Sequence, residues 1–291
     1  MSQESIWRCP NCAGRLFDNG SSWCCESNHT FDKAKQGYTN LLLANQKNSL
    51  EPGDSAEMIN ARRDFLSAGY YQPLAEMLAD ITRLHLTKKT GDTSATHVLD
   101  LGCGDGYYVK HIQEKNVQEK QSQPDVASPR MVCHGIDISK IAVKKSAQSQ
   151  PSNHFAVASN YAIPVMDDCV DVALCVFAPV SLSDVVRVLK KDGVFIRVYP
   201  APRHLYELKT ALYEQVTLHE EPKDSEHFHL LSQQRCTYTT TIDGTQAIRD
   251  LLAMTPLNWR GNHAAKQGLI DAAELSLTCD FYVQMLEPRN G

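Results

Sequence analysis

The chain has 291 residues, of which 42% are hydrophobic and 22% are charged, and its formal net charge is −5 at pH 7. This length allows one large globular domain or two smaller ones. The negative charge excludes a general electrostatic attraction to nucleic acid, so any RNA contact must come from a local patch.

The sequence carries no sign of a membrane or secretory destination. The longest apolar stretch, residues 170–180, is too short to span a bilayer and contains Asp171, so we expect no membrane partner. The first ten residues lack the basic and apolar segments of a signal peptide. Of the ten cysteines, four precede residue 26 and the other six are scattered. We therefore expect a protein of the reducing cytoplasm.

Residues 1–43 are expected to form a small metal-binding unit. Cys9, Cys12, Cys25 and His29 have the spacing C-x2-C-x12-C-x3-H, which is typical of a structural zinc site in a zinc ribbon. Cys24 is an alternative third ligand. A redox-active C-x-x-C is the other interpretation, but it leaves the second pair of ligands without a role. Since so short a segment cannot bury enough surface to fold alone, zinc would supply the folding energy.

Between the ligand pairs, Asp18-Asn19-Gly20 predicts the turn of a small hairpin. Several basic residues of the unit are accompanied by the aromatic residues Trp7, Trp23, Phe31 and Tyr38. They could form an RNA-contact surface. A solvated surface over a very small core is an equally good interpretation of this composition.

A linker is expected at 44–53, followed by two helices. Asp54 is the expected N-cap of the first, which ends at Gly69. The second helix, 72–86, has an apolar stripe suited to packing on a sheet. Within the first, Arg62 and Arg63 could contact phosphate or simply lie on a solvated helix face.

The stretch Val98–Tyr108 reads VLDLGCGDGYY and predicts a buried strand, a glycine-rich turn and the start of a helix. The spacing D-x-G-x-G-x-G differs from both the dinucleotide fingerprint and the P-loop. It resembles motif I of class I S-adenosylmethionine (SAM) methyltransferases. The residues of this stretch assigned to cofactor binding are Asp100, Gly102, Cys103, Gly104, Gly106 and Tyr107. Within this set we expect Asp100 to brace the loop and Cys103 to serve only as a small residue that fits.

The next segments alternate between strand and helix patterns. A helix is expected at 107–115 and a polar surface loop at 116–130. Strands are expected at 131–136, 155–158, 170–176 and 194–198, with a turn at 190–193. This alternation predicts a Rossmann-like, doubly wound parallel sheet of class α/β with helices on both faces.

A ligand should lie where the parallel strands end. Those ends carry Gly102, Asp137, Ser159-Asn160 and Phe177-Ala178-Pro179. An acid after the second strand usually binds ribose hydroxyls, and Asn160 could bond the adenine edge. Asp137, Asn160 and Ala178 therefore join the expected cofactor site.

After the parallel strands, Arg203 and His204 should lie near the pocket rim. A short helix is expected at 244–254. The last two strands are expected at 235–240 and 277–283, and residues 54–291 would form the methyltransferase domain.

The zinc-ribbon spacing, Ala61-Arg62-Arg63, the stretch 69–74, VLDLGCGDGYY and the stretch 202–209 together resemble the RlmA family along almost the whole chain. These are 23S ribosomal RNA (guanine-N1)-methyltransferases. The resemblance implies zinc binding by Cys9, Cys12, Cys25 and His29, which favours Cys25 over Cys24. It also implies a SAM site lined by Tyr71, Gly102, Asp137 and His204, with rRNA as substrate and a possible homodimer.

The family modifies guanine 745 or guanine 748 in one hairpin of the RNA, and this sequence looks closer to the guanine 745 branch. Guanine N1 must lose its proton during transfer, with charge moving to O6, so the site needs a base and a donor. His204 is a candidate for either role, and Arg203 could stabilise O6. A SAM methyltransferase acting on a non-RNA substrate is one rival interpretation. A non-catalytic RNA-binding zinc-ribbon protein is the other.

Overall fold

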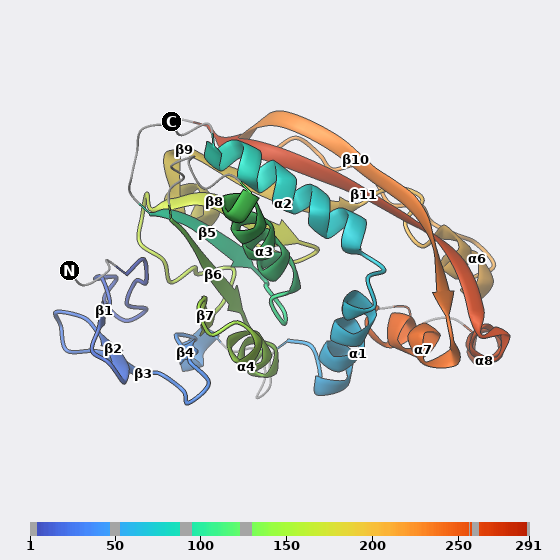
Figure 1. Cartoon of the computed structure of the whole chain (residues 1–291), viewed down its shortest axis with the longest axis horizontal. Coiled ribbons are helices and arrows are strands. Elements are labelled where there is room, and N and C mark those ends of the chain that lie inside the picture. Colours follow the sequence, from blue (N-terminus) through green and yellow to red (C-terminus); the bar gives the residue numbers. More distant parts are fainter. Residues whose placement is uncertain are drawn as a thin grey trace.

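The computed structural model describes residues 5–46, 53–87, 95–122, 130–255, 257 and 262–289. It contains a three-stranded sheet near the N-terminus and a large sheet of eight strands (Figure 1). Among the described residues, no helix is both long and apolar enough to cross a bilayer.

The large sheet is parallel through most of its width and antiparallel at one edge. In spatial order its strands are β10 (Phe228–Asp243), β11 (Glu274–Pro288), β9 (Leu189–Pro200), β8 (Val170–Val176), β5 (Thr96–Leu101), β6 (Met131–Asp137), β7 (His154–Val157) and β4 (Thr39–Asn40). All neighbouring pairs from β4 to β9 are parallel, whereas β11 runs antiparallel to β9 and β10 antiparallel to β11. The long antiparallel pair β10–β11 arches beyond the parallel strands in Figure 1.

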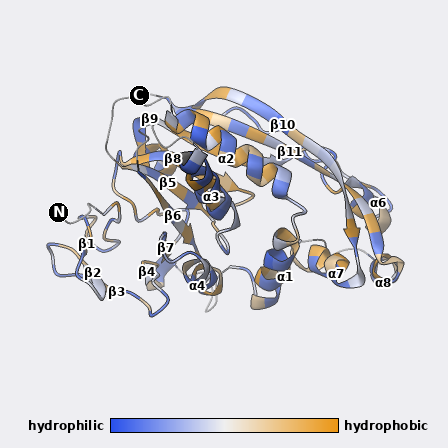
Figure 2. Ribbon diagram, in the orientation of Figure 1, coloured by the Kyte–Doolittle hydropathy of each residue, from blue (hydrophilic) through white to orange (hydrophobic). Residues whose placement is uncertain are grey.

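Helices cover both faces of this sheet, as the alternating pattern predicts. The helices are α1 (Ala56–Ser67), α2 (Gln72–Thr87), α3 (Tyr107–Ser122), α4 (Lys140–Ser149), α5 (Leu182–Val188), α6 (Tyr206–Leu212), α7 (Thr245–Ala253) and α8 (His263–Ala272). Because successive strand residues face opposite ways, Val98 packs with α2, α3 and α4, whereas Leu99 packs with α5 and the N-terminal unit. Figure 2 shows the resulting apolar colouring of the central strands.

The N-terminal unit contains the predicted hairpin. Strand β1 (Phe17–Asp18) pairs with β2 (Ser22–Cys24), which also pairs with β3 (Thr30–Asp32). The expected aromatic RNA-contact surface is wrong for most of its members, because Trp7, Trp23 and Tyr38 are at most 8% exposed. Their side chains fill the core instead, where burial of a large aromatic ring stabilises a small unit most.

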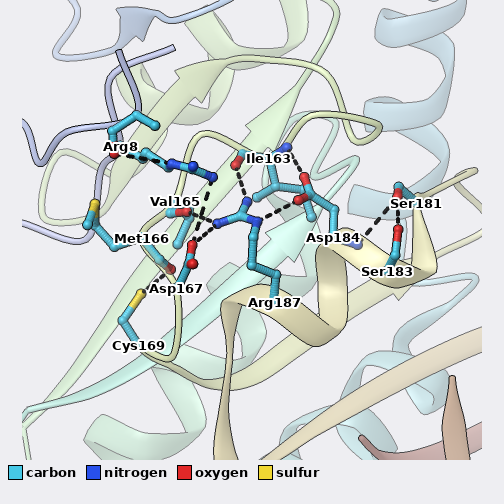
Figure 3. A network of polar contacts seen from close by, with 11 residues as sticks. Arg8, Ile163, Val165, Met166, Asp167, Cys169, Ser181, Ser183, Asp184 and Arg187 are labelled. Atoms are coloured by element: carbon cyan, nitrogen blue, oxygen red, sulfur yellow. Dashed lines mark hydrogen bonds and ion pairs between the residues drawn. The ribbon is translucent and has the colours of Figure 1, made fainter. Parts of the chain in front are cut away.

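The N-terminal unit is joined to the large sheet by backbone and side-chain contacts. Residues 7 and 165 form an isolated bridge, and the Arg8 N–H donates to the carbonyl of Pro164. Figure 3 shows how Arg187 of α5 holds residues 163–167, the segment that the N-terminal unit contacts. Arg187 donates to the carboxylates of Asp184 and Asp167 and to the backbone carbonyls of Ile163 and Val165. Arg8 also forms an ion pair with Asp167.

The N-terminal half of the chain departs from the expected elements at two boundaries. The N-cap of α1 is Ser55 instead of Asp54, since the Ser55 hydroxyl accepts from the Met58 N–H. Helix α3 continues to Ser122 through the first part of the expected polar loop, where Glu119 pairs with Arg83 of α2. Residues 123–129 of that loop and 47–52 of the expected linker lie outside the described residues; a 3-10 helix, η1 (Ala44–Gln46), precedes the latter.

The C-terminal half also contains more regular structure than expected. The expected turn at 190–193 is part of β9, which begins directly after α5 and pairs with β8 from Leu189 onward. The last two strands are longer than predicted because they pair with each other from Phe228–Pro288 to Asp243–Glu274. Neither α8 nor the pairing of β4 with β7 was expected.

Candidate cofactor site and zinc site

The glycine loop connects β5 to α3 with three residues in the left-handed region. Gly102, Gly104 and Gly106 have φ values of 76°, 56° and 83°. A Cβ at position 102 would lie 2.5 Å from the Cβ of Ala178, so only glycine fits between the loop and the residue after β8. At position 104 a Cβ would meet nothing within 4 Å. The loop surface at Gly104 is therefore open for the close approach of a ligand.

Asp137, at the end of β6, braces the loop. Its carboxylate accepts hydrogen bonds from the N–H of Gly104 at 3.0 Å and from the N–H of Ser139 at 2.8 Å. The bracing role expected for Asp100 therefore belongs to Asp137. Burial raises the pKa of Asp137, although these two hydrogen bonds act in the opposite direction. Each carboxylate oxygen retains a lone pair for a further donor such as a ribose hydroxyl.

Helix α4 holds the loop from its other side. The Ser146 hydroxyl donates to the carbonyl of Gly104 at 2.8 Å, and the Gln150 amide donates to the carbonyl of Gly106 at 3.0 Å. Both side chains were missed in the sequence, because only the packing of α4 against the loop brings them there. Cys103 turns away from the loop surface, since a Cβ on Gly135 of β6 would lie 2.9 Å from its Sγ.

Three buried polar atoms around the loop have no hydrogen-bond partner among the described residues. They are Asp100 Oδ2, Tyr107 Oη and Asn160 Oδ1, all on residues assigned to the cofactor site. Burial is the main cause that raises the pKa of Asp100 to about 8, with Asp137 and Asp105 adding to it. An unpaired buried polar atom is costly. The set fits SAM, which offers an ammonium group and an adenine amino group as donors and a carboxylate as acceptor.

Asn160 is held at the mouth of this site. Its side-chain NH2 group donates to the carbonyl of Pro179 at 3.2 Å, and its backbone carbonyl accepts from the N–H of Ser181. The amide nitrogen would lie 3.2 Å from a Cβ on Gly102. The ends of β5, β7 and β8 therefore meet at the loop, as the sequence predicts.

The side chains of Tyr71 and His204, which are 133 residues apart in the sequence, lie next to each other. His204 is 8% exposed, and its Nδ1 accepts from the N–H of Asp280 at 3.4 Å. The ring proton must then lie on Nε2, which is 3.3 Å from the hydroxyl of Tyr71. Burial, followed by the nearby His219 and Lys209, lowers the pKa of His204 to about 3. His204 is thus a neutral ring with both nitrogens engaged.

Arg203 lies apart from this pair. Its side chain is exposed, and the guanidinium carbon lies 5.4 Å from the ring centroid of Tyr206. Arg62 is engaged within the protein. It pairs with Asp54 and donates to the carbonyl of Met254, which ties the start of α1 to the end of α7.

The four expected zinc ligands gather in the N-terminal unit. The ligand atoms of Cys9, Cys12, Cys25 and His29 all lie within 4.8 Å of one another. Sγ of Cys12 is 3.6 Å from Sγ of Cys25, which is 3.4 Å from Nδ1 of His29. Tetrahedral zinc bound to sulfur and nitrogen separates its ligand atoms by about 3.5 to 3.8 Å. The donor set and its spacing therefore fit a closed structural zinc site.

The sulfur of Cys24 is directed to a different environment. Its Sγ lies 3.4 Å from the Thr30 hydroxyl and 3.6 Å from the Ser22 hydroxyl. Cys25 and not Cys24 is therefore the third ligand of the cluster, because the two side chains lie on opposite sides of the chain where β2 ends.

Comparison with known proteins agrees with both sites. The family model described as "RlmA, N-terminal" matches residues 7–50, and the model described as "Methyltransferase domain" matches residues 92–248. The chain is 33% identical over 258 residues to the 23S rRNA (guanine(748)-N(1))-methyltransferase of Streptomyces fradiae, covering 87% of this chain and 85% of the relative. It is 31% identical to the "Putative 23S rRNA (guanine-N(1)-)-methyltransferase YxjB" of Bacillus subtilis (strain 168), covering 88% of this chain and 87% of that relative.

Proposed function

The chain belongs to the RlmA family of SAM-dependent 23S rRNA (guanine-N1)-methyltransferases, and we propose that it transfers the methyl group of SAM to N1 of guanine 745. The observation that carries the proposal is the presence in one chain of the Cys3His cluster and a braced D-x-G-x-G-x-G loop. The loop accounts for the methyl donor, and the ribbon accounts for the class of substrate.

The protein's first task is to orient the donor. Bound SAM supplies an electrophilic methyl group on a positively charged sulfur, and transfer is a single in-line displacement. Asp137 and Asn160 would hold the ribose and adenine, and Asp100 would accept from the ammonium group. Because Asp137 and Ser146 already fix the loop through Gly104, little reorganisation is needed on binding.

The second task concerns the proton and charge of the guanine. Neutral guanine N1 carries a proton that must pass to water as the new bond forms, and negative charge develops on O6 while that proton leaves. Burial raises the pKa of Tyr71 well above its usual range, so its hydroxyl stays protonated. The Nε2–H of His204 donates to the oxygen of Tyr71, so the Tyr71 hydroxyl is free to donate its own proton. We propose that His204 acts through Tyr71, as a positioning residue, and that Tyr71 is the donor.

Arg203 would act from the rim. Its exposed guanidinium, stacked over Tyr206, is placed to meet RNA approaching the site. We propose that it stabilises charge on O6 or the adjacent RNA backbone, as predicted from the sequence.

Primer extension on ribosomal RNA tests the function directly. An N1 methyl blocks the pairing edge of guanine, so reverse transcriptase stops beside the modified base. RNA from cells lacking the gene should show no stop, and the complemented strain should regain it at position 745. A restored stop at position 748 would assign the enzyme to the other branch, which contains the Streptomyces fradiae relative. A stop that persists without the gene would contradict the proposal.

The zinc ribbon is proposed to hold the RNA beside the pocket. Removing residues 1–43 is a poor test, since Leu16 and Trp23 share a core with the sheet. Charge reversal at the exposed Lys35 is a gentler change: Lys35→Glu should weaken RNA binding and leave SAM affinity unchanged. The homodimer implied by the family resemblance is also proposed, and light scattering on the purified protein tests it.

A further inference from the structure

A cluster of aromatic rings lies beside the cofactor loop. It is built from four parts of the chain, residues 65–71 and the segments around residues 177, 204 and 281, and its members are Phe65, Tyr71, Phe177, His204 and Phe281. Four of these side chains are at most 8% exposed, whereas Phe177 is 45% exposed. Phe177 is thus the one member of this cluster that offers its ring to solvent.

The ring of Phe177 is supported from within the protein. Its centroid lies 5.6 Å from that of Phe281 and 6.2 Å from that of His204, and its plane is only 25° from the His204 plane. An exposed phenylalanine fixed against two buried rings cannot turn inward to hide its apolar surface. A large apolar ring held outward in this way points to a partner with a flat face.

The backbone at Phe177 is strained. Its φ is 58°, in the left-handed region that a bulky residue rarely adopts. The turn aims two neighbouring side chains at different targets: Ala178 meets the cofactor loop at Gly102, and Phe177 joins the aromatic cluster. The site expected for SAM and the exposed ring of Phe177 are therefore adjacent.

We propose that Phe177 is the stacking surface for the target guanine. The inference rests on the proposed function: a base in an RNA hairpin must leave its stack to reach the pocket, and an aromatic ring can replace the stacking that it loses. Stacking on Phe177 leaves the edge of the guanine free, so that N1 faces the cofactor on the Ala178 side of the turn and O6 faces the Tyr71 hydroxyl.

Substitutions at position 177 separate the ring from the backbone. Phe177→Leu keeps apolar bulk without an aromatic face, and Phe177→Gly removes the ring while accepting the positive φ. Phe177→Tyr and Phe177→Trp keep a stacking face. The measurements are kcat and KM for 23S rRNA from cells lacking the gene, the Kd for SAM by calorimetry, and the melting temperature.

We expect kcat/KM for RNA to fall about 10- to 100-fold in the Leu and Gly variants, as loss of one stacked base predicts. The Tyr and Trp variants should stay within about threefold of wild type, because they keep the stacking face. The Kd for SAM should be unchanged in all four, and Phe177→Gly should not lower the melting temperature.

Three results would contradict either the proposed function or the stacking role of Phe177. If wild-type protein transfers no methyl to this RNA, the proposed function itself fails. If it does, and the Leu and Gly variants keep full kcat/KM, the stacking role is overturned and the function stands. A weakened Kd for SAM in those variants also overturns it, because Phe177 would then contact the cofactor.

Discussion

At the scale of single residues, burial sets the protonation of the site. It raises the pKa of Asp100 to about 8 and lowers that of His204 to about 3. A carboxyl with this pKa is mostly protonated at neutral pH and becomes an anion when a cationic group binds beside it. Because buried His204 does not gain a proton at neutral pH, it acts as a fixed neutral hydrogen-bond donor instead of a general base.

Replacement of His204 distinguishes a positioning role from base catalysis. In His204→Gln, the amide oxygen can accept from the Asp280 N–H and the amide N–H can donate to Tyr71, so both contacts of the neutral ring are reproduced. His204→Ala loses both and should lower the single-turnover rate at saturating SAM about 100-fold. We expect the Gln variant to retain most of the rate; a Gln variant as slow as Ala would show that the imidazole takes the proton.

At the scale of elements, the strand–loop–helix unit is the feature that the sequence identifies best. Its glycine spacing, its preceding strand and the acid after β6 could all be read from the chain. What the sequence could not indicate is that Asp137 braces the loop and which glycine is essential, because the first depends on how the end of β6 meets the loop and the second on the position of Ala178. The extension of α3 to Ser122 likewise depends on contacts with α2 that span more than thirty residues of sequence.

Two glycines of the loop provide a matched pair. In Gly102→Ala the new Cβ would collide with Ala178 at 2.5 Å, with φ at 76°. We expect a loss of about 1–3 kcal/mol in the free energy of unfolding and a large loss of SAM affinity. Gly104→Ala meets no atom within 4 Å, so it should cost only about 1 kcal/mol for its positive φ. Urea denaturation and SAM calorimetry measure both; equal effects of the two substitutions would contradict this account of the loop.

The adjacent cysteines of the ribbon offer a second matched pair. Cys25→Ser removes one of four zinc ligands, whereas Cys24→Ser removes a sulfur that bonds only to nearby side chains. The zinc content of purified Cys25→Ser should fall well below one ion per chain, with a lower melting temperature. Cys24→Ser should keep one ion and wild-type stability. Loss of zinc from the Cys24 variant would show that the third ligand has been misassigned.

At the scale of the whole molecule, the ribbon and the methyltransferase domain share one apolar core on the face of the sheet opposite α2, α3 and α4. A row of histidines lies at this junction. Nδ1 of His97 is 3.0 Å from Nε2 of His134, whose ring stacks on His154 and meets the edge of Trp7. Burial lowers the pKa of all three, that of His97 to about 4.

This row predicts acid-sensitive stability. Because the folded-state pKa values lie below the unfolded value of about 6.5, the unfolded chain binds more protons as the pH falls through 6.5 toward 4. The free energy of unfolding should drop by about 1 kcal/mol per histidine between pH 7 and pH 5.5. Urea denaturation at these pH values, with zinc in excess, measures the drop. His154→Gln should show a shallower dependence; an identical slope would show that His154 does not contribute to the acid sensitivity.

The sequence by itself determined the chemistry of this protein, because both sites consist mainly of local motifs. A strand, a glycine turn and a helix lie within eleven residues, and the zinc ligands form two short pairs, so the spacing alone specifies what they can bind. Only the tertiary structure decided how those motifs are held. Long-range packing brings Tyr71 to His204, Ala178 to Gly102 and the ribbon to the sheet, and it turns the ring of Phe177 outward. Such contacts join residues far apart in the chain, and no local pattern encodes which of them will meet.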